Sequence, residues 1–142
     1  MNLSRRLLLT LCVIAIAGCA SGPKFSEMQS KMPTLKASEG RIYVYRDSTF
    51  GAAMVPAVLV NGQEAGRSMA NSFFYVDVPA GEYKVSATTE VERSVSLVLA
   101  GGETKFVKSS IGFGLFAGRP NFELVNEAAG RAALQSLSYS GK

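Results

Sequence analysis

The 142-residue chain contains no histidine, no tryptophan and only two cysteines. The absence of histidine excludes imidazole acid–base chemistry, histidine-type catalytic triads and most zinc sites. Two cysteines are too few for a disulfide framework or a four-cysteine metal site. The domain also lacks a Ser-x-x-Lys pair and calcium-ligand spacing. Glu90 and Glu92 could share a strand face, but such a pair is typical of a solvated turn or strand end. We therefore expect no enzymatic activity, no cofactor and no metal.

Residues 1–18 have the pattern of a secretory signal peptide. Arg5 and Arg6 precede an uncharged apolar run over residues 7–17, which ends in small residues. The run is well short of the roughly 20 residues that a transmembrane helix requires. We therefore expect removal of this segment rather than a membrane span.

The end of that run, Ile16-Ala17-Gly18-Cys19, resembles the lipobox of bacterial lipoproteins. The resemblance implies diacylglyceryl transfer to the Cys19 thiol, cleavage between Gly18 and Cys19, and acylation of the new amine. Three acyl chains would hold the protein stably on a membrane. Ala20 and Ser21 follow the cysteine in place of aspartate, which by resemblance to Gram-negative sorting favours the outer membrane, with the domain facing the periplasm. The alternative is a secreted protein with an unmodified Cys19.

Charge patterning argues against a nucleic-acid partner. The net charge of the whole chain is +4, and it falls to +2 when Arg5 and Arg6 leave with the signal. The remaining basic residues are scattered, whereas nucleic-acid-binding proteins concentrate them on a helix or stripe. We expect a solvated surface and no nucleic-acid binding.

Residues 19–40 are predicted to be a lipidated tether, and residues 41–142 the folded domain. Within the tether, Ser26 and Gln29 have the spacing of a capping box, and Pro33 should end the helical turn that follows. We favour a turn that rests on the domain over a partner-binding motif.

From residue 41 the sequence predicts a mainly β fold, an antiparallel β-sandwich of transthyretin or immunoglobulin type with a short C-terminal helix. Asn61-Gly62 between two β-rich runs predicts a type I′ hairpin. Asn126 is a suitable N-cap for the terminal helix. In the run 72–78 we expect the face of Phe74 to be more buried than the face of Phe73. The predicted strands are residues 41–46, 55–60, 63–66, 72–78, 83–89, 91–99, 104–111 and 121–125.

Several phrases together resemble a family of small bacterial lipoproteins known as domain-of-unknown-function family 2846. The phrases are Gly40-Arg-Ile-Tyr-Val-Tyr-Arg46, Val60-Asn-Gly-Gln63, Phe74-Tyr-Val-Asp-Val-Pro-Ala-Gly-Glu-Tyr83, Gly102-Glu103, Gly118-Arg-Pro120 and Glu123-Leu-Val125. Their order and spacing cover roughly residues 38–140. The resemblance implies a periplasm-facing β-sandwich with no assigned activity.

The glycine-rich stretch at residues 111–120 is unusual for a loop because it contains Phe113, Leu115 and Phe116. Loops are normally polar, so exposed apolar side chains there would indicate a membrane or partner contact. Alternatively, the three side chains fold back on the sandwich or the terminal helix, which is the interpretation we favour. Arg119 could contact a lipid headgroup or lie on the surface without a partner.

Two functions remain from this sequence. The first is an outer-membrane-anchored lipoprotein in the bacterial cell envelope, acting as a non-catalytic interaction or structural module with an envelope protein partner. The second is a binding protein for an apolar or amphiphilic small molecule, held between the sheets or under the loop that carries Phe113 and Phe116. The second predicts a dry cavity of a few hundred cubic ångströms.

Overall fold

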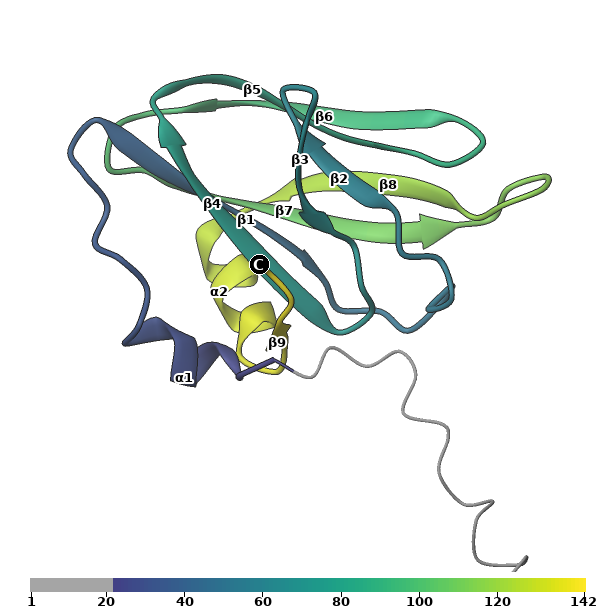
Figure 1. The fold of residues 1–142 in the computed structure, drawn as a ribbon, viewed down its shortest axis with the longest axis horizontal. Helices are drawn as coiled ribbons and strands as arrows, with labels where there is room; N and C mark the ends of the chain where they lie inside the picture. The colour runs from purple at the N-terminus through teal and green to yellow at the C-terminus, as the bar shows by residue number, and fades with distance from the viewer. Residues whose placement is uncertain (1–21) are drawn as a thin grey trace, which may run out of the picture.

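The computed structural model describes residues 22–142 and shows two packed β-sheets (Figure 1). The predicted signal peptide and the cleavage and lipidation site at Gly18 and Cys19 lie outside the described residues. Among the described residues, no helix has the length and apolarity to cross a membrane. The elements are α1 (Phe25–Gln29), β1 (Glu39–Arg46), β2 (Ala57–Val60), β3 (Gln63–Arg67), β4 (Ser72–Pro79), β5 (Gly81–Thr88), β6 (Glu92–Leu99), β7 (Thr104–Gly112), β8 (Arg119–Val125), α2 (Glu127–Leu134) and β9 (Ser138–Tyr139).

The predicted β-sandwich with a short C-terminal helix is confirmed. One sheet has the strand order β8-β7-β1-β4-β9, and the other has the order β3-β2-β5-β6. Most neighbours are antiparallel, but β1 pairs with β7 and β4 pairs with β9 in parallel. These two parallel pairs bring parts of the chain that are more than 60 residues apart side by side in the larger sheet.

The hairpin between β2 and β3 turns where the sequence predicts. Asn61 has a φ of 47° and Gly62 a φ of 81°, which are the positive values that a type I′ turn requires. The register of the pair shifts between Val58 and Leu59, which face Gly66 and Glu64, so the extra residue Ala65 forms a bulge in β3. The local turn chemistry alone is enough to fix this connection.

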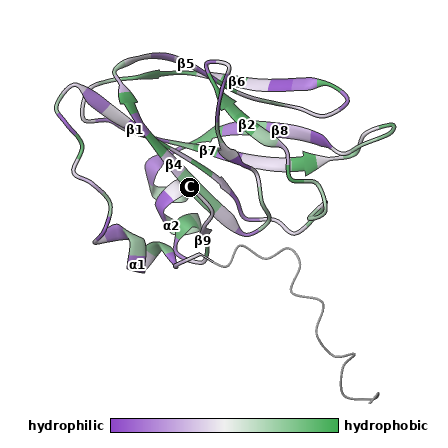
Figure 2. Ribbon diagram, in the orientation of Figure 1, coloured by the Kyte–Doolittle hydropathy of each residue, from purple (hydrophilic) through white to green (hydrophobic). Residues whose placement is uncertain are grey.

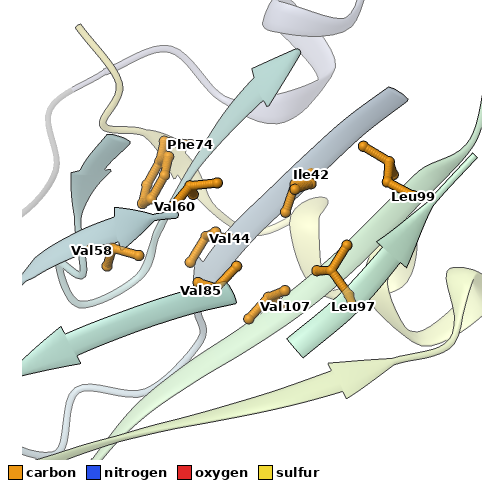
Figure 3. Close-up of a cluster of buried hydrophobic side chains, with 9 residues drawn as sticks. All are labelled: Ile42, Val44, Val58, Val60, Phe74, Val85, Leu97, Leu99 and Val107. Carbon is orange, nitrogen blue, oxygen red and sulfur yellow. The ribbon is translucent and has the colours of Figure 1, made fainter. Parts of the chain in front are cut away.

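The space between the sheets is filled by an aliphatic core with one aromatic ring (Figure 3). All nine of its side chains are buried, and they come from both sheets. Removing such side chains from water is the main stabilising contribution in a sandwich. They are Ile42, Val44, Val58, Val60, Phe74, Val85, Leu97, Leu99 and Val107.

The outer face of the larger sheet is buried too, under α1 and α2. Phe25 of α1 packs edge-on against Phe73, with ring centroids 5.5 Å apart, and Tyr43 stacks on Phe106 at 5.2 Å. Phe73 is therefore as buried as Phe74, so the expectation of a less buried Phe73 was wrong. The reason is that the helices cover this face, which a strand's own alternation does not reveal.

The N-terminal helical turn rests on the domain. Tyr139 N donates to Pro23 O at 2.8 Å, and Phe25 is completely buried. The predicted capping box at Ser26 and Gln29 was wrong, because the helix begins two residues earlier than a Ser26 N-cap would place it. Lys24 is the N-cap, and its backbone N–H donates to the Glu27 carboxylate at 2.8 Å.

Candidate functional site

Two loops carry apolar side chains into solvent at one end of the sandwich. Phe113, Leu115 and Phe116 in the β7–β8 loop are 87%, 77% and 93% exposed, and Phe50 in the β1–β2 loop is half exposed. The Phe50 and Phe113 rings meet edge-on, with centroids 5.0 Å apart. We refer to Phe50, Phe113, Leu115 and Phe116 as the apolar tip. Such a gathering of exposed apolar side chains is typical of a contact surface.

The expectation that the β7–β8 loop folds back was therefore wrong. Lys108 of β7 lies level with Tyr45, one residue before β1 ends, but β7 continues to Gly112. The hairpin thus projects past the end of the sheet, as Figure 1 shows at the right of the view. Figure 2 shows that the loop is hydrophobic along this projecting part. Within residues 22–142 the three side chains therefore remain largely exposed.

Glu90, in the turn between β5 and β6, holds the β7–β8 loop through the loop's backbone. Its carboxylate accepts hydrogen bonds from the backbone N–H of Leu115 at 2.8 Å and of Phe116 at 3.0 Å. Arg119 donates its Nε to the same carboxylate at 2.7 Å. The neighbouring Thr89 hydroxyl donates to Gly118 O at 2.7 Å. These bonds fix the loop backbone and leave its apolar side chains facing outward.

We refer to the hydrogen bonds of Glu90 with Arg119 and with the Leu115 and Phe116 amides as the Glu90 clamp. These bonds favour the ionised form of the Glu90 carboxyl. The hydrogen bond from Arg119 is the largest cause, and the amides of Phe116 and Leu115 add to it, so the pKa of Glu90 falls to about 2. Arg119 is thus engaged in the clamp, with about a third of its side chain exposed. Glu92 pairs separately with Lys84. The two carboxylates considered together from the sequence therefore have different partners.

Arg46 holds the other loop of the tip from inside. Its side chain is completely buried, and its guanidinium donates to the backbone oxygens of Phe50 and Met54 at 2.8 Å and of Ser68 at 3.0 Å. Its Nε makes no hydrogen bond within the described residues. Burial lowers the pKa of Arg46. Neither residue is identified by a sequence motif: Arg46 donates to backbone oxygens 4, 8 and 22 residues later, and Glu90 accepts from amides 25 and 26 residues later.

Beneath the tip lies a hollow of about 310 Å³ that opens to solvent. Phe50, Met54 and Ile111 line it together with residues 112–118. Gly51 allows its loop to approach β7 closely: its φ is +66°, and a Cβ there would lie 2.8 Å from the Ile111 side chain. A larger open hollow of about 630 Å³ lies away from the tip, between exposed parts of β6 and β8 that include Val98 and Leu124.

The fold and the tip together define a small β-sandwich domain with an exposed apolar end. The chain belongs to the family described as protein of unknown function (DUF2846), whose sequence profile matches residues 36–119. It is 28% identical over 132 residues to an uncharacterized protein of Haemophilus influenzae (strain ATCC 51907 / DSM 11121 / KW20 / Rd), covering 89% of this chain and 79% of that one. No solved structure matches the chain. The family match includes both loops of the tip, Glu90 and Arg119.

Proposed function

We propose that this protein is a lipoprotein anchored through Cys19 to the outer membrane of a bacterial envelope, with its domain in the periplasm. The observation that carries the proposal is the lipobox-like sequence Ile16-Ala17-Gly18-Cys19 behind a short basic and apolar segment. Three acyl chains on one residue would anchor the domain stably. Only residues 20 and 21 separate that anchor from the first described residue, Gly22.

The domain itself acts as a non-catalytic interaction module. Its best-defined surface feature is the apolar tip. Glu90 and Arg46 hold it in place through six hydrogen bonds, three to the Glu90 carboxylate and three from the Arg46 guanidinium. Fixing the loops before contact reduces the conformational entropy lost on binding. The tip is thus suited to contact, and its apolar side chains supply no reactive group.

Metabolic labelling with radioactive palmitate tests the anchor. The wild-type protein should carry label, and Cys19→Ala should lose it together with membrane attachment. Cys12→Ala is the matched control, because Cys12 lies within the removed segment and its loss should leave labelling unchanged. Label that persists in Cys19→Ala would contradict the proposal. Density-gradient fractionation then tests which membrane holds the protein: Ala20→Asp should move the protein from the outer to the inner membrane.

A second candidate function is the binding of an amphiphilic small molecule in the hollow beneath the tip. The observation in its favour is the apolar lining of Phe50, Met54 and Ile111 around about 310 Å³. The core between the sheets is filled by side chains, which counts against a ligand held there. Met54→Trp should fill the hollow and abolish co-purification of an amphiphile in native mass spectrometry. Retention of the ligand in that variant would refute this site.

A further inference from the structure

We propose that the apolar tip inserts into the lipid surface of the same bilayer that holds Cys19. This inference rests on the lipid anchor proposed above and adds a second, reversible membrane contact made by the folded domain. Its occupant is lipid, and the contact fixes the orientation of the domain on the membrane.

The strand register places the start of the domain at a particular end of the larger sheet. Arg46, the last residue of β1, pairs with Ser72 of β4, and Ser72 pairs with Ser138 of β9. Tyr139, next to Ser138, donates its backbone N–H to Pro23 at 2.8 Å. The chain therefore enters the domain at the Arg46 end of β1, beside β9 (Figure 1).

Both loops of the tip leave from that same end. The β1–β2 loop begins directly after Arg46, and β7 runs parallel to β1 with Lys108 level with Tyr45. From β9 to β7 the sheet spans three strand spacings, roughly 14 Å at about 4.8 Å each. The anchor side and the base of the tip thus lie at the same end of the larger sheet, and the hairpin projects beyond it (Figure 1).

The short segment between Cys19 and Gly22 limits how far the membrane can lie from this end of the sheet. Cys19 precedes Gly22 by three residues, which reach at most about 10 Å when fully extended. A bilayer that holds the acyl chains of Cys19 must therefore pass close to Pro23. An apolar hairpin that projects from the same end is therefore within reach of that bilayer, which makes lipid a nearer partner than another protein.

The polar groups of the loop are arranged as a lipid environment requires. Backbone groups that enter lipid without a hydrogen-bond partner carry a penalty of several kcal/mol each. Glu90 already accepts from the amides of Leu115 and Phe116, and Thr89 already donates to Gly118 O. These three backbone groups of the loop are therefore already hydrogen-bonded. A partner that added a β-strand here would need such groups to be free.

The charges at the base of the tip are paired, so the contact does not depend on anionic headgroups. Arg119 bonds Glu90 at 2.7 Å, and Lys108 bonds Asp47 at 3.0 Å. A tip made of Phe and Leu side chains over paired charges partitions by apolar burial. Insertion into zwitterionic vesicles should therefore be insensitive to salt.

The natural absence of tryptophan makes a direct depth measurement feasible, because Phe116→Trp introduces a single indole. The full lipidated protein is reconstituted in phosphatidylcholine–phosphatidylethanolamine vesicles with brominated acyl chains, which quench an indole only at close range. Val98→Trp is the matched control: Val98 is 65% exposed, and it lies at the opposite end, since the adjacent Leu99 packs against Gly40. Leu115→Trp provides a second position on the tip.

Both tip variants should lose most of their emission in brominated vesicles, and Val98→Trp should keep its emission. Mass spectrometry of the N-terminal peptide on the same samples separates the two proposals. A peptide without lipid overturns the anchor, whereas lipidated protein with unquenched tip indoles overturns the present inference alone. Sedimentation of that unquenched protein at the dimer mass would identify a second copy as the occupant of the tip.

Discussion

Strand β1 carries an arginine near each end, and the two guanidinium groups are buried in different ways. Arg41 forms two hydrogen bonds with the Asp77 carboxylate, at 2.7 and 2.8 Å, and lies 4.6 Å from the centre of the Tyr75 ring. Its pKa is raised, chiefly by the bond to Asp77. Arg46 bonds only backbone oxygens, and burial lowers its pKa. No carboxylate among residues 22–142 forms an ion pair with Arg46.

Each arginine fixes a segment that has no regular structure of its own. Arg41 also donates to Pro33 O at 2.8 Å and thereby holds the segment between α1 and β1. Arg46 holds the β1–β2 loop and with it Phe50 of the apolar tip. A buried charge without a counterion is unfavourable, and here backbone dipoles alone offset that cost. Within residues 22–142, Arg46 is therefore held by backbone oxygens without a carboxylate, whereas Arg41 at the other end of β1 is neutralised by Asp77.

The largest expected effect comes from Arg46→Ala. The substitution leaves three backbone oxygens without a donor and opens a cavity in place of a completely buried side chain. We expect a loss of about 3–5 kcal/mol in the free energy of unfolding, measured by urea denaturation. Arg67→Ala is the control, since its exposed side chain should contribute within about 0.5 kcal/mol. A loss below about 1 kcal/mol for Arg46→Ala would mean that the loop does not depend on this residue.

Asp77→Ala tests the ion pair between Arg41 and Asp77. It leaves Arg41 as a largely buried charge without its partner, so we expect a loss of about 2–4 kcal/mol in the same urea titration. The double substitution Arg41→Met with Asp77→Leu removes both charges and should lose less than Asp77→Ala alone. If the double variant is the less stable of the two, the guanidinium hydrogen bond to Pro33 O matters more than charge compensation.

Gly51 and Gly62 form a matched pair that isolates the packing of the β1–β2 loop. Both have a positive φ, but a Cβ on Gly62 would meet nothing within 4 Å, whereas one on Gly51 would lie 2.8 Å from Ile111. Gly62→Ala should lose about 1 kcal/mol from backbone strain, and Gly51→Ala about 2 kcal/mol because a clash is added. Thermal unfolding measures both. Equal losses would show that the loop moves away from β7 without penalty.

Sequence reasoning succeeded where neighbouring residues determine the structure. The Asn61-Gly62 turn follows from backbone sterics, and Asn126 caps α2 by accepting from Ala129 N at 2.9 Å. The two-sheet architecture follows from period-two alternation between turn signals. In the turn and the cap, the partner groups lie within a few residues of one another along the chain.

It failed where the partner lies far along the chain. Glu90 meets the loop amides 25 and 26 residues later, and no local pattern distinguishes it from a solvated glutamate. Arg46 resembles Arg41 in the sequence, yet only tertiary packing makes one of them unpaired. The apolar loop was expected to pack because hydrophobic burial is the usual outcome. The exposure of the loop depends on how far the β7–β8 hairpin extends past the end of the sheet. That extension is set by the register of β7 against β1.

The smallest expected effect on global stability is the pH response of the Glu90 clamp, because it acts on one loop. The pKa of Glu90 is about 2 in the folded protein, against an ordinary value of 4.5. A folded-state pKa below the unfolded value means that the clamp contributes fully above about pH 4.5 and is lost as the pH falls toward 2. The Leu115 and Phe116 amides should then lose protection against hydrogen exchange, measured relative to the intrinsic exchange rate at each pH, and shift in NMR spectra.

Two substitutions make this response specific to the tip. Glu90→Gln should show fast exchange of the Leu115 and Phe116 amides at every pH, because the neutral amide is a weaker acceptor for them and for Arg119. Glu92→Gln should leave the wild-type transition intact, since Glu92 pairs with Lys84 outside the loop. Slow exchange of both amides in Glu90→Gln would show that the loop is ordered by its own packing. The Glu90–Arg119 pair would then contribute little to the order of the tip, in contrast to the contribution expected of the Arg41–Asp77 pair.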